Sequence, residues 1–223
     1  MASPAALWPP TFKAAIFDFD GTLAATEDIW REVDEAFFFS RGLSYDEFAH
    51  QTLATLGFRG GAEWCIATYG LDEDADAICD EWNRMGRALY ETRVTLRPGA
   101  ADYLRALREK GIPLALATTN DPQVLASMAP RIDVAELFDA VVCGKEVARP
   151  KDHPDIYLEA ARRIGAEPAD CMVFEDILAG TKSAQSVGMS VCALRSTDAR
   201  QPWAELRETA ELAIEGWESV LLA

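Results

Sequence analysis

The sequence predicts an α/β protein with a mostly parallel sheet and an all-helical insertion. From Val94 onward, short apolar runs rich in β-forming residues alternate with amphipathic helical segments, as in a sheet built from right-handed crossovers. Residues 27–92 carry helical periodicity only. Unusual polar residues follow directly after several of the predicted strands.

The first strand is predicted at residues 13–19, where the apolar run KAAIFDF ends in Asp-Gly-Thr. The insertion then begins with Thr26 as the N-cap of a helix that ends at Gly42. The other predicted helices of the insertion lie near 45–56, 61–69 and 72–91. A single strand followed by several helices predicts a helical block inserted after that strand.

The alternation after Val94 predicts the rest of the sheet. The predicted strands are 112–117, 140–143, 171–174, 190–194 and 212–214, and helices are expected before 111, at 122–130, 154–164 and 178–187, and in the tail. This order predicts a Rossmann-like core formed by residues 1–25 and 94–223, with a helical cap at 26–93. The short passages near 24–26 and 93–96 would form the hinge between them.

The composition excludes several classes of protein. The chain of 223 residues has 37 Asp or Glu and 21 Lys or Arg, a net charge of −16, which argues against binding nucleic acid or anionic membranes. No apolar run is long enough to span a bilayer, and the N-terminus does not resemble a secretory signal.

The five cysteines are widely spaced and form no CxxC pair, so we expect reduced thiols in a cytoplasmic protein. With only two histidines, we expect no zinc site. A monomer or weak dimer is the default expectation.

The negative charge is concentrated in the expected cap. Residues 26–95 contain 15 acids and 6 arginines, a balance of −9, and no lysine lies between Lys13 and Lys110. Any cationic contact from the cap must therefore come from an arginine. The candidates are Arg31, Arg41, Arg59, Arg84, Arg87 and Arg93.

The polar residues at the strand ends predict a site, because ligands of an open parallel sheet gather at the carboxyl ends of its strands. The residues concerned are Asp18 and Asp20 after the first strand, Thr118, Thr119 and Asn120 after the second, Lys151 after the third, and Glu175 and Asp176 after the fourth. A cluster of carboxylates needs a counter-ion, and hard oxygen ligands suit Mg²⁺. The hydroxyl groups and the lysine suit a phosphoryl group.

The motifs DFDGTL, LALATTN, Lys151 ahead of HPDIYLEAA, and VFEDILAGTKSAQSVGM occur in one order over residues 13–195. In this the sequence resembles the haloacid dehalogenase (HAD) superfamily, in particular its phosphatase and β-phosphoglucomutase-like branch with a helical cap. The resemblance implies a Mg²⁺-dependent phosphatase that acts on a small phosphorylated metabolite.

The resemblance also implies a role for each site residue. Asp18 would be the nucleophile that forms an aspartyl-phosphate, and Asp20 the general acid and base. Thr118, with Thr119 and Asn120, would hold the phosphoryl oxygens, and Lys151 would neutralise the charge shared by Asp18 and the phosphoryl group. The metal ligands would be Asp18, Asp20 through its backbone carbonyl, Asp176 and Glu175.

Other functions of the same fold are a phosphosugar mutase, a dehalogenase and a non-catalytic binding module. The chain has Trp30 where β-phosphoglucomutases carry a histidine, which disfavours the mutase. Dehalogenases usually lack the second acid, Asp20, and the complete motif set speaks against a module without activity. We expect His50 on the surface or in cap packing, and Trp30, Trp64 and Trp82 mainly in the cap core, with one or two of the cap aromatic residues facing the cleft.

Overall fold

The structure is a computed structural model that describes residues 7–196 and 201–220, except for the side chains of residues 54 and 55. Within these residues the six strands form one parallel sheet, which confirms the predicted parallel sheet. Its strand order, which the sequence did not predict, is β3-β2-β1-β4-β5-β6. The strands are β1 (Ala14–Phe17), β2 (Leu114–Thr118), β3 (Ala140–Cys143), β4 (Cys171–Glu175), β5 (Ser190–Leu194) and β6 (Leu212–Ile214). The strand order reverses direction at β1, so the carboxyl ends of β1, β2 and β4 lie together.

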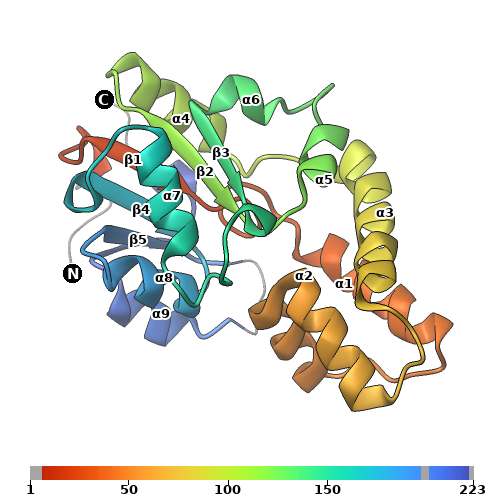
Figure 1. Cartoon of the computed structure of the whole chain (residues 1–223). Helices are drawn as coiled ribbons and strands as arrows, with labels where there is room; N and C mark the ends of the chain where they lie inside the picture. Colours follow the sequence, from red (N-terminus) through yellow and green to blue (C-terminus); the bar gives the residue numbers. More distant parts are fainter. Residues whose placement is uncertain (1–6, 197–200, 221–223) are drawn as a thin grey trace.

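Helices connect and cover these strands (Figure 1). They are α1 (Glu27–Ser40), α2 (Glu47–Tyr69), α3 (Ala75–Arg93), α4 (Ala100–Glu109), α5 (Pro122–Ser127), α6 (Val134–Leu137), α7 (Asp155–Arg163), α8 (Leu178–Gln185) and α9 (Trp203–Thr209). None of the helices in the described ranges combines the length and apolar character that crossing a membrane requires.

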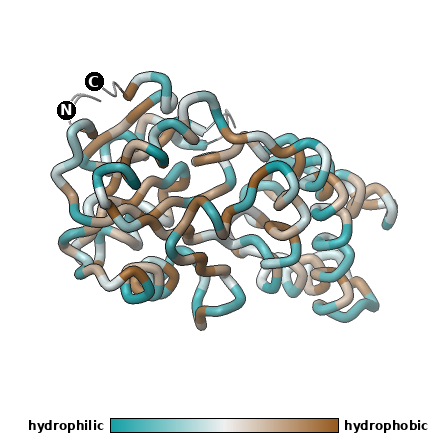
Figure 2. The backbone as a smooth tube through the Cα atoms, turned by 90° about the horizontal axis from the view of Figure 1, so that it is seen from above, coloured by the Kyte–Doolittle hydropathy of each residue, from teal (hydrophilic) through white to brown (hydrophobic). Residues whose placement is uncertain are grey.

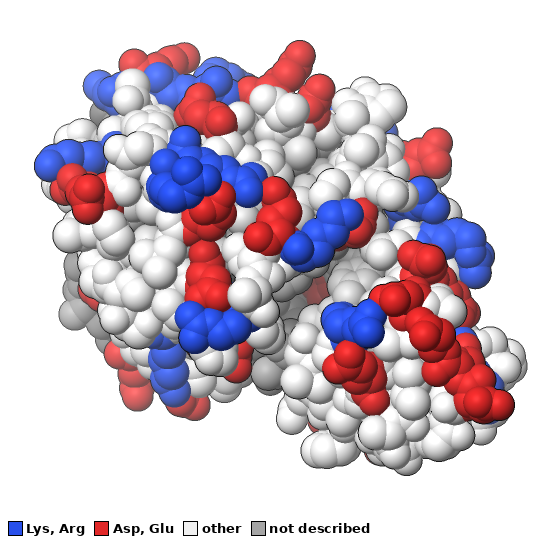
Figure 3. Space-filling model, in the orientation of Figure 1, with Lys and Arg blue, Asp and Glu red and all other residues white. Residues whose placement is uncertain are grey.

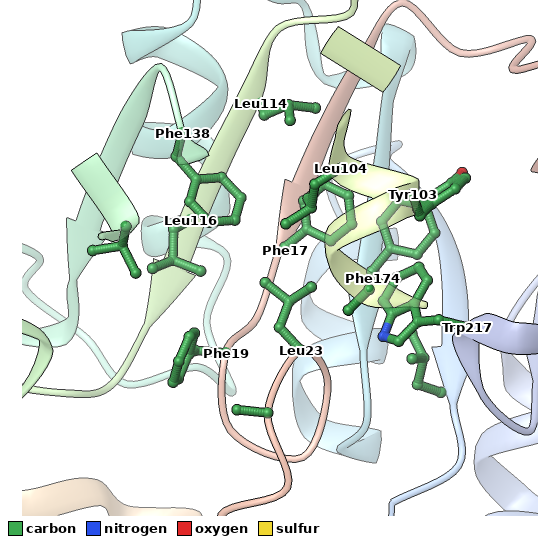
Figure 4. Packing of buried hydrophobic residues seen from close by; sticks show 14 of the residues in the cluster. Phe17, Phe19, Leu23, Tyr103, Leu104, Leu114, Leu116, Phe138, Phe174 and Trp217 are labelled. Atoms are coloured by element: carbon green, nitrogen blue, oxygen red, sulfur yellow. The ribbon is translucent and has the colours of Figure 1, made fainter. Parts of the chain in front are cut away.

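The sheet lies between two apolar layers because successive side chains of each strand point to opposite faces. Phe17 and Phe174 face the layer that contains α4 and α5, where their rings stack with centroids 4.5 Å apart (Figure 4). Ile16 and Val173 face the layer that contains α7 and α8. The strands therefore run as largely apolar segments through the interior (Figure 2), and their burial holds the strand ends in fixed positions.

Helices α1, α2 and α3 form a group beside the sheet (Figure 1). They share an apolar cluster of their own, in which Phe37 packs against Trp82 with ring centroids 5.1 Å apart. Acidic side chains gather on this group (Figure 3). The chain enters α1 and leaves α3 by neighbouring passages, because Ala24 and Leu96 form an isolated antiparallel bridge.

The two helices predicted at 45–56 and 61–69 correspond to the two helical parts of α2, which meet at a kink at Gly57, with φ of 66°. Two other predictions about helix limits were wrong in detail. Helix α5 ends at Ser127, and the short helix α6 that follows was not predicted. Pro154 occupies the N-cap of α7 and not its first helical position.

Thr26 is at the N-cap of α1, but its hydroxyl group makes no capping hydrogen bond. The hydroxyl instead donates to Asp20 Oδ1 over 2.5 Å. A hydrogen bond to a charged carboxylate is stronger than one between a hydroxyl and a neutral backbone group. Thr26 therefore connects the beginning of the helical group to the loop after β1.

Candidate active site

The predicted residues at the strand ends meet around one cavity of about 220 Å³ between the sheet and the helical group. The residues predicted for the site that line this cavity are Asp18, Asp20, Thr119, Asn120, Lys151, Glu175 and Asp176. Thr118 is buried at the end of β2 and is absent from the described lining. Its hydroxyl accepts a hydrogen bond from the Asn120 backbone N–H over 3.1 Å, so it shapes the loop that carries Thr119 and Asn120.

Three buried carboxylates form the floor of the site. Asp18, Glu175 and Asp176 each offer an oxygen, and these oxygens lie within 4.8 Å of one another. The turn after β1 brings Gly21 against Asp176, where a Cβ at Gly21 would lie 2.0 Å from a carboxylate oxygen. Gly21 also has φ of +81°, so glycine is required here both for the backbone and for the approach of the carboxylate. Thr22 Oγ1 donates to Asp176 Oδ1 over 3.3 Å.

Lys151 links two of these carboxylates. Its Nζ donates to Asp18 Oδ1, and to Glu175 Oε2 over 2.9 Å. Tyr157, on α7, donates from its hydroxyl to the same Oε2 over 2.8 Å. A Cβ at Gly180 would lie 2.5 Å from the Tyr157 hydroxyl oxygen, so the small residue on α8 makes room for this contact.

The pKa values of Asp18, Asp176 and Lys151 are shifted, because these groups are buried close to one another. Burial raises the pKa of Asp18 well above its usual range, Lys151 opposes that shift, and Glu175 and Asp176 add to it. Burial and the nearby Glu175 raise the pKa of Asp176 to about 8. Burial alone would lower the pKa of Lys151, but Asp18 and Glu175 outweigh it and raise the pKa, so the side chain stays an ammonium.

These residues fit a divalent cation with oxygen ligands. Three carboxylates with one ammonium leave an excess of negative charge, and the raised pKa values of Asp18 and Asp176 show how unfavourable that excess is. A hard cation would remove the excess, and Mg²⁺ is bound in proteins by one or two carboxylates together with water and phosphate oxygens. Oε2 of Glu175 already accepts hydrogen bonds from Lys151 and Tyr157. Its other oxygen, Oε1, is therefore the better placed of the two to bind a cation.

Asp20 is held in a different way, by neutral donors from several elements. Its Oδ1 accepts hydrogen bonds from Thr26, from Trp30 Nε1 over 3.2 Å and from the Tyr90 hydroxyl, and its Oδ2 accepts from Asn120 Nδ2 over 2.5 Å. Burial raises the pKa of Asp20, and the bonds from Thr26, Tyr90 and Trp30 partly offset that shift. These donors fix the orientation of the carboxyl group, whose pKa lies above its usual value because of burial.

Sequence reasoning missed Tyr90 and Tyr157, and it missed the contact of Thr26 with Asp20. Tyr90 and Tyr157 are fully buried members of helical apolar patterns, and such residues ordinarily belong to the core. Their hydroxyl groups become site residues only because α3 and α7 pack over the strand ends. Thr26 is visible in the sequence as a threonine that precedes a helix, but that position by itself predicts only an N-cap and not a contact with Asp20.

The helical group supplies the other wall of the cavity. Trp30 and Trp82 line it, in agreement with the expectation that one or two of the aromatic residues singled out in the cap face the cleft. Phe58 lines it as well.

His50 packs within the cap beside Tyr45, in line with the expectation of surface or cap packing, and it lines the cavity as well. Helix α2 begins at Glu47, and its N-cap Asp46 accepts the Ala49 N–H.

None of the six cap arginines is among the described residues that line the cavity. Arg41 is paired with Glu73 and Glu81 at 2.5 and 2.7 Å, and Arg84 and Arg87 line a separate hollow between α3 and α5. The expectation that an arginine of the cap adds positive charge to the site therefore finds no support in these residues. Acidic residues of the cap pair with Arg31, Arg41, Arg59 and Arg93, and Arg87 donates to Gln123 of α5.

Comparison with known proteins gives a consistent result. A family model described as haloacid dehalogenase-like hydrolase matches residues 12–188. A curated relative, Protein CbbY of Rhodobacter capsulatus, is 32% identical over 191 residues, which cover 80% of this chain and 83% of the relative. A probable pseudouridine-5'-phosphatase of Drosophila melanogaster is 33% identical over 185 residues, 79% of this chain and 78% of that protein.

A solved structure has the same fold over almost the whole length. It is a CbbY variant from Rhodobacter sphaeroides in complex with xylulose-(1,5)bisphosphate, and it superimposes with a TM-score of 0.81 and 25% identity. The match covers 92% of this chain and 95% of that chain. The likeness therefore includes both the sheet and the helical group.

Proposed function

The chain belongs to the haloacid dehalogenase-like hydrolase family, and on that basis we propose that it is a Mg²⁺-dependent phosphatase of a small phosphate monoester. The reaction would pass through an aspartyl-phosphate on Asp18. The observation that supports this most directly is the position of Lys151, whose ammonium group joins Asp18 to Glu175 beside Asp176 at the floor of the cavity. An ammonium beside a buried carboxylate is what an attack on a phosphate dianion requires.

In the first step, an oxygen of Asp18 attacks phosphorus, and the bond from phosphorus to the ester oxygen breaks. Asp20 gives its proton to the departing oxygen, so the alcohol leaves neutral. This role needs a protonated Asp20, and the upward direction of its pKa shift, caused by burial, favours that form. Lys151 offsets the negative charge that Asp18 and the phosphoryl group share.

In the second step, water attacks the phosphorus of the aspartyl-phosphate while Asp20 takes a proton from it. The bond from phosphorus to Asp18 breaks, which releases phosphate and restores both carboxyl groups. Thr119 and Asn120 line the cavity beside Asp20 and support binding of the phosphoryl oxygens, with Thr118 fixing their loop. Asp20 thus acts first as an acid and then as a base.

A bound Mg²⁺ would stabilise negative charge on the phosphoryl oxygens. We propose that Asp18 and Asp176 hold it, with Glu175 and the backbone carbonyl of Asp20 completing the set. The group of oxygens within 4.8 Å supports the first three of these residues.

We further propose that residues 26–93 act as a cap domain on a core formed by 1–25 and 94–223. The separate apolar cluster of α1–α3 and the paired passages at Ala24 and Leu96 support this division. The five free cysteines support a cytoplasmic location.

The test is release of phosphate from 4-nitrophenyl phosphate with Mg²⁺, and with the metal removed by a chelator. The wild type is expected to be active only with the metal, and Asp18→Asn to be inactive although folded. Asp170→Asn, which changes a partly exposed acid paired with Lys13, is the matched control and should keep full activity. Metal-independent hydrolysis, or full activity of Asp18→Asn, would exclude this mechanism. Isomerisation of a sugar 1-phosphate that needs a bisphosphate primer would indicate a mutase instead.

A further inference from the structure

The cavity carries charge of one sign beyond its phosphate end. Among the described residues that line it, Lys151 is the only Lys or Arg, and every other formally charged side chain is Asp or Glu. Lys151 is itself engaged by Asp18 and Glu175. Among the described lining residues, a second anionic group on the substrate would therefore meet several carboxylates and no lysine or arginine other than Lys151, and like charges in a desolvated place repel strongly.

The cap arginines do not change this balance. Arg41 is held by Glu73 and Glu81. Arg59 is held by Glu63 and Asp76. These ion pairs lie within the helical group, so both arginines are engaged away from the cavity.

Apolar and aromatic side chains form the wall opposite the strand ends. The members of this wall are Trp30, Val33, Leu53, Phe58 and Trp82. The ring of Phe58 meets Trp30 edge to face at 5.3 Å between centroids, and Trp82 in a similar way at 6.0 Å. Phe58 thus packs against both tryptophans, and the three rings together form an apolar surface that suits a flat ring of a ligand.

The other polar residues of the helical wall are Thr26, Glu27, Asp34 and His50, and the last two are joined through Tyr45. The Tyr45 hydroxyl donates to Asp34 Oδ2 over 2.8 Å and lies 2.7 Å from His50 Nδ1. Since that hydroxyl has one proton, His50 Nδ1 is the donor in the second contact. A histidine beside a carboxylate adds no net positive charge to the cavity.

The cavity volume limits the size of the ligand. A dry apolar cavity of roughly 150 Å³ is enough to bind benzene. The cavity here measures about 220 Å³, which leaves space for a phosphoryl group in addition to one ring.

We propose that the substrate is a monophosphate ester of a small ring-bearing alcohol with no second anionic group. The phosphoryl group would lie at Asp18 and Lys151, and the ring against Phe58 and Trp30. This proposal rests on the phosphatase function proposed above and specifies its substrate class. The solved relative described with a bisphosphate would differ from this chain in that respect.

The experiment compares esters whose alcohols leave with similar ease. Benzyl phosphate and ethyl phosphate differ in the ring, and 4-carboxybenzyl phosphate adds one negative charge to the ring. We expect kcat/KM for benzyl phosphate to exceed that for ethyl phosphate by about tenfold or more, in line with the contribution of one apolar group in a pocket. We expect 4-carboxybenzyl phosphate to lose about tenfold or more against benzyl phosphate, since a buried like charge is unfavourable.

Two variants locate the effect. Phe58→Leu should reduce the preference for benzyl over ethyl phosphate, and Leu53→Arg should restore hydrolysis of the carboxybenzyl ester. Phe48→Leu is the matched control, because Phe48 lies on the same helix, is 66% exposed and is absent from the cavity lining. It should leave all three rates unchanged.

Equal kcat/KM for benzyl and ethyl phosphate, or better hydrolysis of the carboxybenzyl ester or of a sugar bisphosphate, would overturn the proposal about the substrate. These results would leave the phosphatase function standing, because each of them is measured as phosphate release. Absence of Mg²⁺-dependent hydrolysis with every ester, including 4-nitrophenyl phosphate, would instead remove the proposed function itself.

Discussion

The hydroxyl group of Tyr90, on the last cap helix α3, donates a hydrogen bond to the carboxylate of Asp20, on the loop after β1. The two residues are 70 positions apart in the sequence. The same hydroxyl accepts from Trp30 Nε1 at 3.0 Å and from Asn120 Nδ2 at 3.2 Å. The Tyr90 hydroxyl thus links Asp20, the proposed general acid and base, to residues on both sides of the cavity. It can fix the orientation of Asp20 only when α3 is packed against the core.

Tyr90→Phe should slow substrates that need a strong general acid more than substrates that do not. The variant loses one of the donors that orient Asp20, so we expect kcat for ethyl phosphate to fall by about tenfold. Hydrolysis of 4-nitrophenyl phosphate should change little, because nitrophenolate leaves without a proton. The measurement is kcat for both esters.

Tyr103→Phe is the control for this change. Tyr103 is as buried as Tyr90, but its hydroxyl contacts the Leu7 carbonyl at 3.4 Å, away from the site. Equal losses on both esters in Tyr90→Phe would mean that Tyr90 only supports the fold.

Lys151→Met should abolish most activity and lower stability in a pH-dependent way. We expect kcat to fall by about 10²-fold to 10³-fold, as on removal of a charge-stabilising group. The buried carboxylates of Asp18 and Glu175 lose their ammonium partner, which costs about 3 kcal/mol or more where they are ionised. Chemical denaturation should show a larger loss at pH 8 than at pH 5. Lys145→Met removes an exposed lysine paired with Asp121 and should show neither effect.

Gly21→Ala should weaken binding of the metal as well as stability. A side chain with positive φ costs about 1–2 kcal/mol at either Gly21 or Gly188. Only at Gly21 would the added methyl group also displace the Asp176 carboxylate, because a Cβ at Gly188, with φ of +83°, meets nothing within 4 Å. Titration with Mg²⁺ should show weaker binding for Gly21→Ala alone. Equal affinity in the two variants would show that Asp176 does not need its present position.

The stability of the metal-free protein should fall as pH rises from about 5 to 8. The pKa of Asp176 is raised from 3.8 to about 8, so over this window the folded state holds a proton that the unfolded state has lost. Stability then decreases with pH by up to about 1.4 kcal/mol per pH unit for one such carboxyl group. Asp176→Asn should flatten this slope, whereas Asp170→Asn should not. Unfolding curves in chelator at several pH values provide the measurement.

Addition of Mg²⁺ should reverse this trend. Binding needs ionised carboxylates, so the metal should stabilise the protein more at pH 8 than at pH 5. A stabilisation by Mg²⁺ that did not grow with pH would argue against Asp18 and Asp176 as its ligands.

The sequence determined much of the fold because the evidence for it is local. The apolar runs of β1, β2 and β4, and the helical periodicity of α1 and α3, each depend on residues a few positions apart. The carboxylates were identifiable for a related reason, since they lie at or just after the ends of β1 and β4, and parallel strands end at one edge. Lys151 lies farther along the loop after β3, and its place in the motif order identified it. The end of α5 and the short helix α6 were less accessible, because tertiary packing overrides weak local preferences.

Only the tertiary structure decided how the site is oriented and what can enter it. Tyr157 orients Glu175, and Tyr90 orients Asp20, through contacts that arise when helices distant in sequence pack on the strand ends. The count of cap arginines allowed a cationic contact, but pairing within the cap removes Arg41 and Arg59 from the cavity. Local patterns thus specified the chemical groups of the site. Long-range packing specified their orientation, the apolar wall at Phe58 and hence the proposed substrate class.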